Sequence, residues 1–163
     1  NDRTLLESEI NAMSPLGSTH INLGAAWGWR VLSPQAPFTQ GTSYSDPDWN
    51  KAAIILTDGD NTMIDSFYSA YGLLSDGNLG TTSSTTAKNE LNNRLLDVCT
   101  GMKNDGIIVY TIAFGTSIAT ATATLLEACA STPNSYYDSP DATTLSLAFR
   151  AIGAELKSLH LSQ

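Results

Sequence analysis

The stretch AAIILTDGDN, residues 52–61, decides the fold of this chain. Five apolar residues in a row are typical of a strand buried on both faces, as strands are in parallel sheets. A carboxylate, Asp58, follows the strand almost at once. Because ligands collect at the carboxyl ends of strands in open α/β sheets, Asp58 is predicted to lie where a hard cation can be held.

The composition indicates one ordinary domain with few surface charges. Hydrophobic residues make up 42% of the 163 residues and charged residues only 15%, which suits an extracytoplasmic protein. A net charge of −8 disfavours binding to nucleic acid or anionic lipid. No apolar run approaches the roughly 18–20 residues of a membrane span. The chain opens at Asn1 without a visible signal peptide, which predicts a processed or excised piece.

Helical and strand patterns alternate along the chain. Apolar periodicity predicts helices at about 4–13, 21–32, 63–74, 87–102, 122–130 and 141–159. Continuous apolar or aromatic runs predict strands at 52–56, 107–114 and 135–137. This order predicts an α/β fold with a mostly parallel sheet and helices on both faces. The polar stretch 61–86 is predicted to be a mobile loop within a single domain, residues 1–163.

Local patterns also predict helix caps and core faces. Thr4 and Glu7 fit a capping box at the start of the first helix. In the second helix, Trp27 is predicted to be in the core and Trp29 at the surface. The last helix is expected to bury an apolar stripe formed by Leu145, Phe149, Ile152, Leu156 and Leu159.

Three segments together resemble a von Willebrand factor type A domain. They are Gly17-Ser18-Thr19, the strand 54–59 that ends in Thr57-Asp58-Gly59, and the apolar run 106–115. More narrowly, three others resemble the carboxyl-terminal part of TadG-like proteins of bacterial tight-adherence pilus systems: WGWRVLSP at 27–34, Cys129-Ala130-Ser131 followed by Tyr136-Tyr137, and residues 145–152.

The resemblance implies a doubly wound, Rossmann-like sheet with a metal-ion-dependent adhesion site at its carboxyl edge. The metal ligands it implies are the hydroxyl of Thr19 and the carboxylate of Asp58, with Asp60 as a less certain third. Mg²⁺ or Mn²⁺ is the expected ion, because hydroxyls, carboxylates and waters suit a hard cation. The implied function is adhesion or pilus assembly in a bacterial cell envelope. A protein partner would supply an acidic side chain to the metal, and no enzymatic activity is expected.

The chain departs from the family pattern in one respect. The first motif, Asp-x-Ser-x-Ser, is not found, and the central strand that carries it is expected to precede Asn1. The sheet is therefore predicted to be partial, and metal binding to be weak or absent. The strand at 52–56 would then have an uncovered edge that could pair with a second copy of the chain.

One enzymatic alternative fits the same residues. Asp58-Gly59-Asp60-Asn61-Thr62 after an apolar strand matches Asp-x-Asp-x-Thr, which resembles the first motif of haloacid-dehalogenase-type phosphotransferases. There the first Asp would be a nucleophile and the second a general acid, with Mg²⁺. Against this reading, the motif should follow the first strand near the amino terminus.

The two cysteines, Cys99 and Cys129, form no zinc pattern. From their spacing alone, a disulfide and two buried thiols are equally acceptable. The resemblance favours a disulfide, because it places them on the helices before and after the strand 107–114, where neighbouring crossover helices can bring them within about 6 Å.

Overall fold

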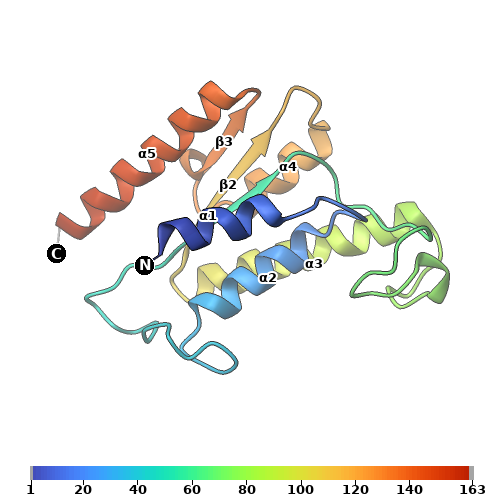
Figure 1. The fold of residues 1–163 in the computed structure, drawn as a ribbon, viewed down its shortest axis with the longest axis horizontal. Coiled ribbons are helices and arrows are strands. Elements are labelled where there is room, and N and C mark those ends of the chain that lie inside the picture. Colours follow the sequence, from blue (N-terminus) through green and yellow to red (C-terminus); the bar gives the residue numbers. More distant parts are fainter. Residues whose placement is uncertain (1, 162–163) are drawn as a thin grey trace.

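The computed structural model describes residues 2–161, with a three-stranded parallel sheet between two layers of helices (Figure 1). The strands are β1 (Ala52–Thr57), β2 (Ile108–Phe114) and β3 (Tyr136–Ser139), in the order β1-β2-β3. Ala52 pairs with Ile108, and Thr111 pairs with Tyr136. Among the described residues, β1 and β3 are thus the two edges, and the predicted α/β fold class is confirmed.

Five α-helices surround or extend from this sheet. Two short 3₁₀ helices, Leu74–Asp76 and Pro133–Ser135, complete the elements. The α-helices are α1 (Arg3–Ala12), α2 (Ile21–Leu32), α3 (Ser84–Asn104), α4 (Thr120–Cys129) and α5 (Ala142–Leu161). No helix within residues 2–161 has the length and apolarity needed to cross a membrane.

The central strand β2 has a packed core on both of its faces. Val109 packs with residues of α2, α3 and α4, whereas Tyr110 and Ile112 pack against Ala148 and Ile152 of α5. All three β2 side chains are fully buried. Burial on both faces is the reason why a parallel strand reads as a continuous apolar run.

A disulfide joins α3 to α4 within this core. Cys99 and Cys129 are bonded, their Cα atoms are 5.2 Å apart, and both residues are fully buried. The structure therefore selects the disulfide over the pair of buried thiols.

The helix predicted at 63–74 is wrong. This segment contains turns, an isolated bridge between Ser69 and Gly72, and no α-helix. Gly72 has a φ of +77°, which ends any regular helix there. Met63 and Leu79 are instead buried against Ala87 and Leu91 of α3. The last residues of the polar stretch 61–86 are helical, because α3 begins at Ser84. The mobility expected for this stretch stays a prediction.

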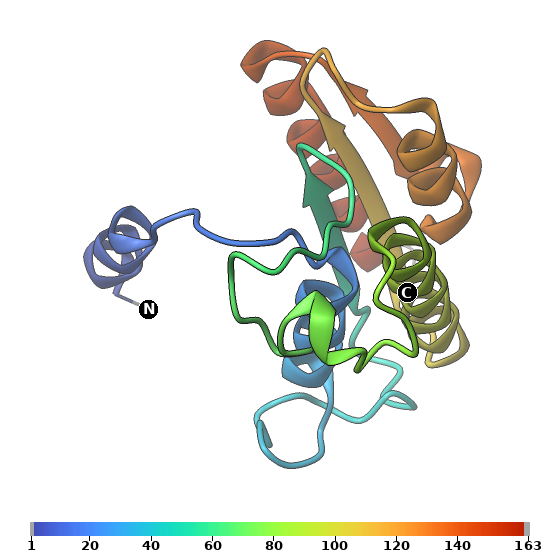
Figure 2. The same cartoon turned by 90° about the vertical axis from the view of Figure 1, so that its right-hand side faces the viewer.

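The first helix begins earlier than expected and stands away from the body (Figure 2). Asp2, not Thr4, is the N-cap, and its carboxylate accepts the N–H of Leu5 at 3.1 Å. None of the residues of α1 is buried, and its apolar positions Leu6 and Ile10 are 59% and 62% exposed.

The two tryptophans of α2 have exchanged their predicted roles. Trp29 packs against the core beside α3, and its indole N–H donates to Asp105 at 2.9 Å. Trp27 is 46% exposed, and Arg30 lies 4.9 Å above its ring. On α5, Phe149 is likewise exposed although its helical spacing predicted burial. On α5 the predicted apolar stripe is wider than the face that the sheet covers.

Candidate functional site

A tight turn presents Asp58 at the carboxyl end of β1. The hydroxyl of Thr57 donates to the Gly59 carbonyl at 2.9 Å and accepts the Gly59 N–H at 3.2 Å. This pair of bonds reverses the chain directly after the strand. Thr57 is buried as a result, whereas Asp58 is exposed.

The residues that follow this turn position Thr19. The N–H of Thr19 donates to the Thr62 hydroxyl at 2.8 Å, and the Thr19 carbonyl accepts the Thr62 N–H at 2.9 Å. Asn61 accepts the N–H of Ile21 at 2.8 Å, which satisfies a free donor at the start of α2. His20 occupies the N-cap position of α2 but makes no side-chain cap hydrogen bond, so Asn61 satisfies this donor from a distant segment.

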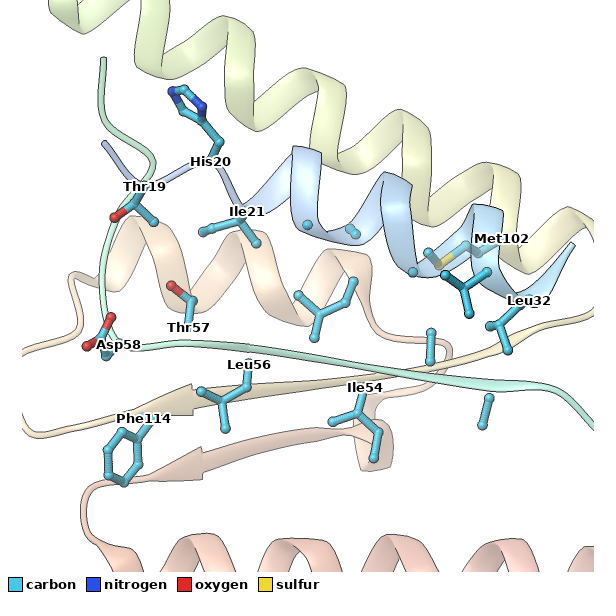
Figure 3. Close-up of a pocket in the computed structure, with 17 residues that line it drawn as sticks. Thr19, His20, Ile21, Leu32, Ile54, Leu56, Thr57, Asp58, Met102 and Phe114 are labelled. Carbon is cyan, nitrogen blue, oxygen red and sulfur yellow. The ribbon is translucent and has the colours of Figure 1, made fainter. Parts of the chain in front are cut away.

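Thr19 and Asp58 consequently lie at the same end of one groove. The groove has a volume of about 740 Å³ and runs along β1 beneath α2. Figure 3 shows the side chains of Thr19, Thr57 and Asp58 grouped at its end, with Ile54 and Leu56 farther along the strand. The predicted pair of oxygen ligands is therefore brought together.

The third predicted ligand, Asp60, has other partners. One of its carboxylate oxygens accepts from Lys88 of α3 and the other from the Thr122 hydroxyl of α4. The hydrogen bonds from Lys88 and Thr122 lower the pKa of Asp60 below its ordinary value. Asp60 thus fastens the β1 turn to two helices, and its role as a metal ligand stays a prediction.

A divalent cation fits this site only in part. The described residues contain no group of three or more His, Cys, Asp or Glu side chains that could hold a metal. Thr19 and Asp58 offer side-chain oxygens at the end of the groove. The hydroxyl of Ser18, the residue before Thr19, is buried without a hydrogen-bond partner within residues 2–161, but Ser18 does not line the groove. Mg²⁺ is often held by one or two carboxylates and several waters, so this donor set suits a weak site.

His20 is adjacent to Thr19 but turns away from Asp58 (Figure 3). Its ring packs edge-on against Tyr71, with the ring centroids 5.3 Å apart. Burial lowers the pKa of His20, so the imidazole is neutral at pH 7. Asn22 donates to the Tyr71 hydroxyl at 2.7 Å, and these contacts hold the segment around Tyr71 against α2.

Replacing Asp60 by alanine is expected to lower the free energy of unfolding by about 1–2 kcal/mol, because Lys88 and Thr122 lose their acceptor. Since the pKa of Asp60 is lowered in the fold, its stabilisation is complete above its ordinary pKa and is lost as the pH falls through the folded value. Urea denaturation at about pH 7 and pH 3 measures both effects. Asp97→Ala, which removes an exposed carboxylate of α3, is the control. Equal losses in the two variants would contradict the assignment.

Sequence reasoning missed Asn61, Thr62, Lys88 and Thr122 as the residues that hold the site in place. Asn61 and Thr62 lie in the loop directly after β1, so their place in the sequence could have indicated a role at the site. Lys88 and Thr122 carry no local pattern, because each acts only through a tertiary contact.

Solved structures show the same fold, although no protein-family model and no curated protein matches the sequence. One is proximal thread matrix protein 1 from the mussel byssus, with a TM-score of 0.55 and 19% identity over 91% of this chain and 30% of that one. Another structure of that protein is described as having a zinc-occupied MIDAS motif, a metal-ion-dependent adhesion site. Its TM-score is 0.51, with 19% identity over 96% of this chain and 29% of that one. The pilus adhesin SpaC from Lactobacillus rhamnosus GG has a TM-score of 0.54, with 13% identity over 98% of this chain and 21% of that one.

These similarities show a fold like that of the von Willebrand factor type A domain. The chain spans under a third of the length of the proteins it matches.

Proposed function

We propose that this protein is an adhesion module that binds a protein partner at the carboxyl edge of its sheet. The observation that carries the proposal is the placement of Thr19 and Asp58 at one end of the same groove, on the chain segments where the resemblance expects metal ligands. The similarity to a matrix protein with a zinc-occupied metal site and to a pilus adhesin supports this class of function.

The finer assignment is a Tad-type pilus-assembly role in a bacterial cell envelope, on the periplasmic or extracellular side. The sequence segments that resemble TadG-like proteins support it, and the buried disulfide suits an oxidising compartment. The partner would supply an acidic side chain, because a carboxylate can complete the oxygen shell of a divalent cation.

Thr19 and Asp58 would hold Mg²⁺ or Mn²⁺ weakly in this chain. The ion would supply a positive charge that binds the partner's carboxylate. Asp58 is free to take this role because its carboxylate is exposed at the end of the turn. Asp60 would have to release Lys88 before it could contribute a third oxygen.

The phosphotransferase alternative receives no support from the geometry. A general acid must carry a proton at the working pH, whereas Lys88 and Thr122 hold the pKa of Asp60 below its ordinary value. Thr62, the last residue of that motif, is used to hold the backbone of Thr19. The proposed function is accordingly non-enzymatic.

Titration with Mn²⁺, followed by electron paramagnetic resonance, tests the metal site. We expect binding in the millimolar range, and a loss of about tenfold or more in Asp58→Asn. Asp97→Asn removes an exposed carboxylate that does not line the groove and should leave binding unchanged. Absence of Mn²⁺ binding, or equal binding by Asp58→Asn, would contradict the proposed site.

The homodimer expected through the edge of β1 stays a prediction. Light scattering on a sizing column at high protein concentration tests it. A monomer at all concentrations would contradict the dimer prediction and would not bear on the proposed metal site.

A further inference from the structure

A second hollow lies at the carboxyl ends of β2 and β3, toward which the arrows of both strands point (Figure 1). It has a volume of about 320 Å³ and is lined by residues from the connections after the two strands, from the start of α4 and from β3 itself. All of these residues fall within 115–140, and none belongs to β1. We call this feature the β2–β3 hollow, and the proposed metal site does not use it.

The hollow lies on the same edge of the sheet as the metal-site groove. Because the three strands are parallel, their carboxyl ends share one edge, and Gly115 of the hollow directly follows Phe114 of the groove. β1 and β3 are two strand spacings apart, which is about 10 Å. A partner that binds at the end of β1 can therefore reach the hollow as well.

The inner wall of the hollow is apolar and aromatic. Tyr136, Ile118 and Ala123 line it, and all three residues are half-buried. Tyr136 and Asp138 project from the same face of β3, because they are alternate residues of one strand. An aliphatic chain can lie against this wall while its polar end reaches the Asp138 carboxylate.

The rim of the hollow carries negative charge. Burial raises the pKa of Tyr136, and the nearby carboxylates of Asp138 and Glu127 raise it further, so the phenol keeps its proton at pH 7. Both carboxylates are exposed, neither forms an ion pair within residues 2–161, and no Lys or Arg lines the hollow. The hollow thus presents uncompensated negative charge beside an aromatic ring.

An anionic occupant fits the hollow less well. The start of α4 lies beside it, and the N-cap residue Ala119 makes no side-chain cap hydrogen bond. The free N–H groups there would favour an anion by about 0.3–1 kcal/mol. The carboxylates of Asp138 and Glu127 carry full charges, which outweigh the partial charge of one helix end. A cation that can donate hydrogen bonds is therefore the favoured class of occupant.

We propose that the β2–β3 hollow binds a basic side chain, Lys or Arg, of a partner protein. The aliphatic part of that side chain packs on Ile118, Ala123 and the ring of Tyr136, and its charged end donates to the Asp138 carboxylate. Naming a protein partner at this edge rests on the proposed function, whereas the affinity of the hollow for a basic side chain does not. The hollow needs no metal ion, so the two sites can be tested separately.

Lysine capped as its Nα-acetyl methylamide is the probe, and amide chemical shifts in ¹H–¹⁵N NMR spectra, recorded in EDTA, follow its binding. We expect saturable shifts centred on Gly115, Thr116 and Asp138, with half-saturation in the millimolar range. The norleucine analogue keeps an apolar stem without the charge and should bind about fivefold or more weakly.

Three results would overturn the proposal: no saturable shift at the hollow, equal binding of the norleucine analogue, or tighter binding of the glutamate analogue. The last would identify an anion site at the start of α4 instead. Because EDTA removes divalent cations, none of these results bears on the Mn²⁺ titration of the metal site.

Two variants test the walls of the hollow, each with a matched control. Asp138→Asn should raise the half-saturation concentration about fivefold or more, whereas Asp97→Asn, on α3 outside the hollow, should bind like the wild type. Ala123→Leu fills the hollow without changing its charge and should weaken binding by a similar factor, whereas Ala121→Leu, exposed on α4 outside the hollow, should not. Unchanged binding by Asp138→Asn, or by folded Ala123→Leu, would overturn the proposal.

Discussion

Replacing Gly101 by alanine is expected to destabilise the protein by about 2 kcal/mol, although alanine is the better helix former. Gly101 lies within α3, and a Cβ there would be 2.2 Å from Cη2 and 2.7 Å from Cζ3 of Trp29. The indole cannot retreat freely, because it packs against the core and donates to Asp105. The clash therefore separates α2 from α3 or breaks the contact between Trp29 and Asp105.

Urea denaturation of Gly101→Ala measures this effect, and Gly153→Ala is its control. A Cβ at Gly153 in α5 meets nothing within 4 Å, so that change should be neutral or stabilising by up to about 1 kcal/mol. Trp29→Phe shortens the ring that blocks the added methyl. The double variant should thus lose less stability than the sum of the two single variants. Additive losses would mean that Trp29 is not the obstacle.

Removing the bond between Cys99 and Cys129 is expected to lower the free energy of unfolding by about 3–4 kcal/mol in the chain-entropy model, because the bond closes a loop with a sequence separation of 30. Both sulfur atoms lie in the core between α3 and α4. The loss of stability therefore affects the helix layer that packs against α2 and β1. The measurement is the urea midpoint of the oxidised protein against that of the Cys99→Ala/Cys129→Ala variant.

Two controls separate the covalent bond from core packing. Reductant added to the unfolded wild-type protein should lower its midpoint toward that of the double variant, and should leave the midpoint of the double variant unchanged. Free-thiol titration of the denatured protein without reductant should find no reactive thiol. Two reactive thiols, or an unchanged midpoint after reduction, would contradict the stabilising bond.

The elements that sequence reasoning predicted well are those whose signal is local. Continuous apolar runs identified β1 and β2, and helical spacing identified α3 and α5, because the strand and helix periods are set by backbone geometry. The segment 63–74 was misjudged because turn residues and a positive φ at Gly72 interrupt an otherwise acceptable pattern. The exchange of Trp27 and Trp29 has another cause, since both are apolar and only the position of α3 selects which one is buried.

The candidate site likewise has residues that the sequence could predict and residues that it could not. The sequence predicted Asp58 from its place after an apolar strand, and the resemblance to a von Willebrand factor type A domain implied Thr19; the structure puts both in one groove. It gave no means to foresee that Lys88 and Thr122 hold Asp60, because these residues are 28 and 62 positions away from it. Long-range polar contacts leave no periodic trace in a sequence.

By itself, the sequence determined the order of helices and strands, the parallel sheet and the carboxylate at the end of β1. These follow from apolar runs and helical stripes, which each segment carries regardless of its neighbours. Only the tertiary structure decided that Asp60 is held by two helices, that Cys99 bonds to Cys129, and that Trp29 rather than Trp27 packs against the core. The reason is that each of these features depends on the distance between segments far apart in the chain, which is set only when the layers pack together.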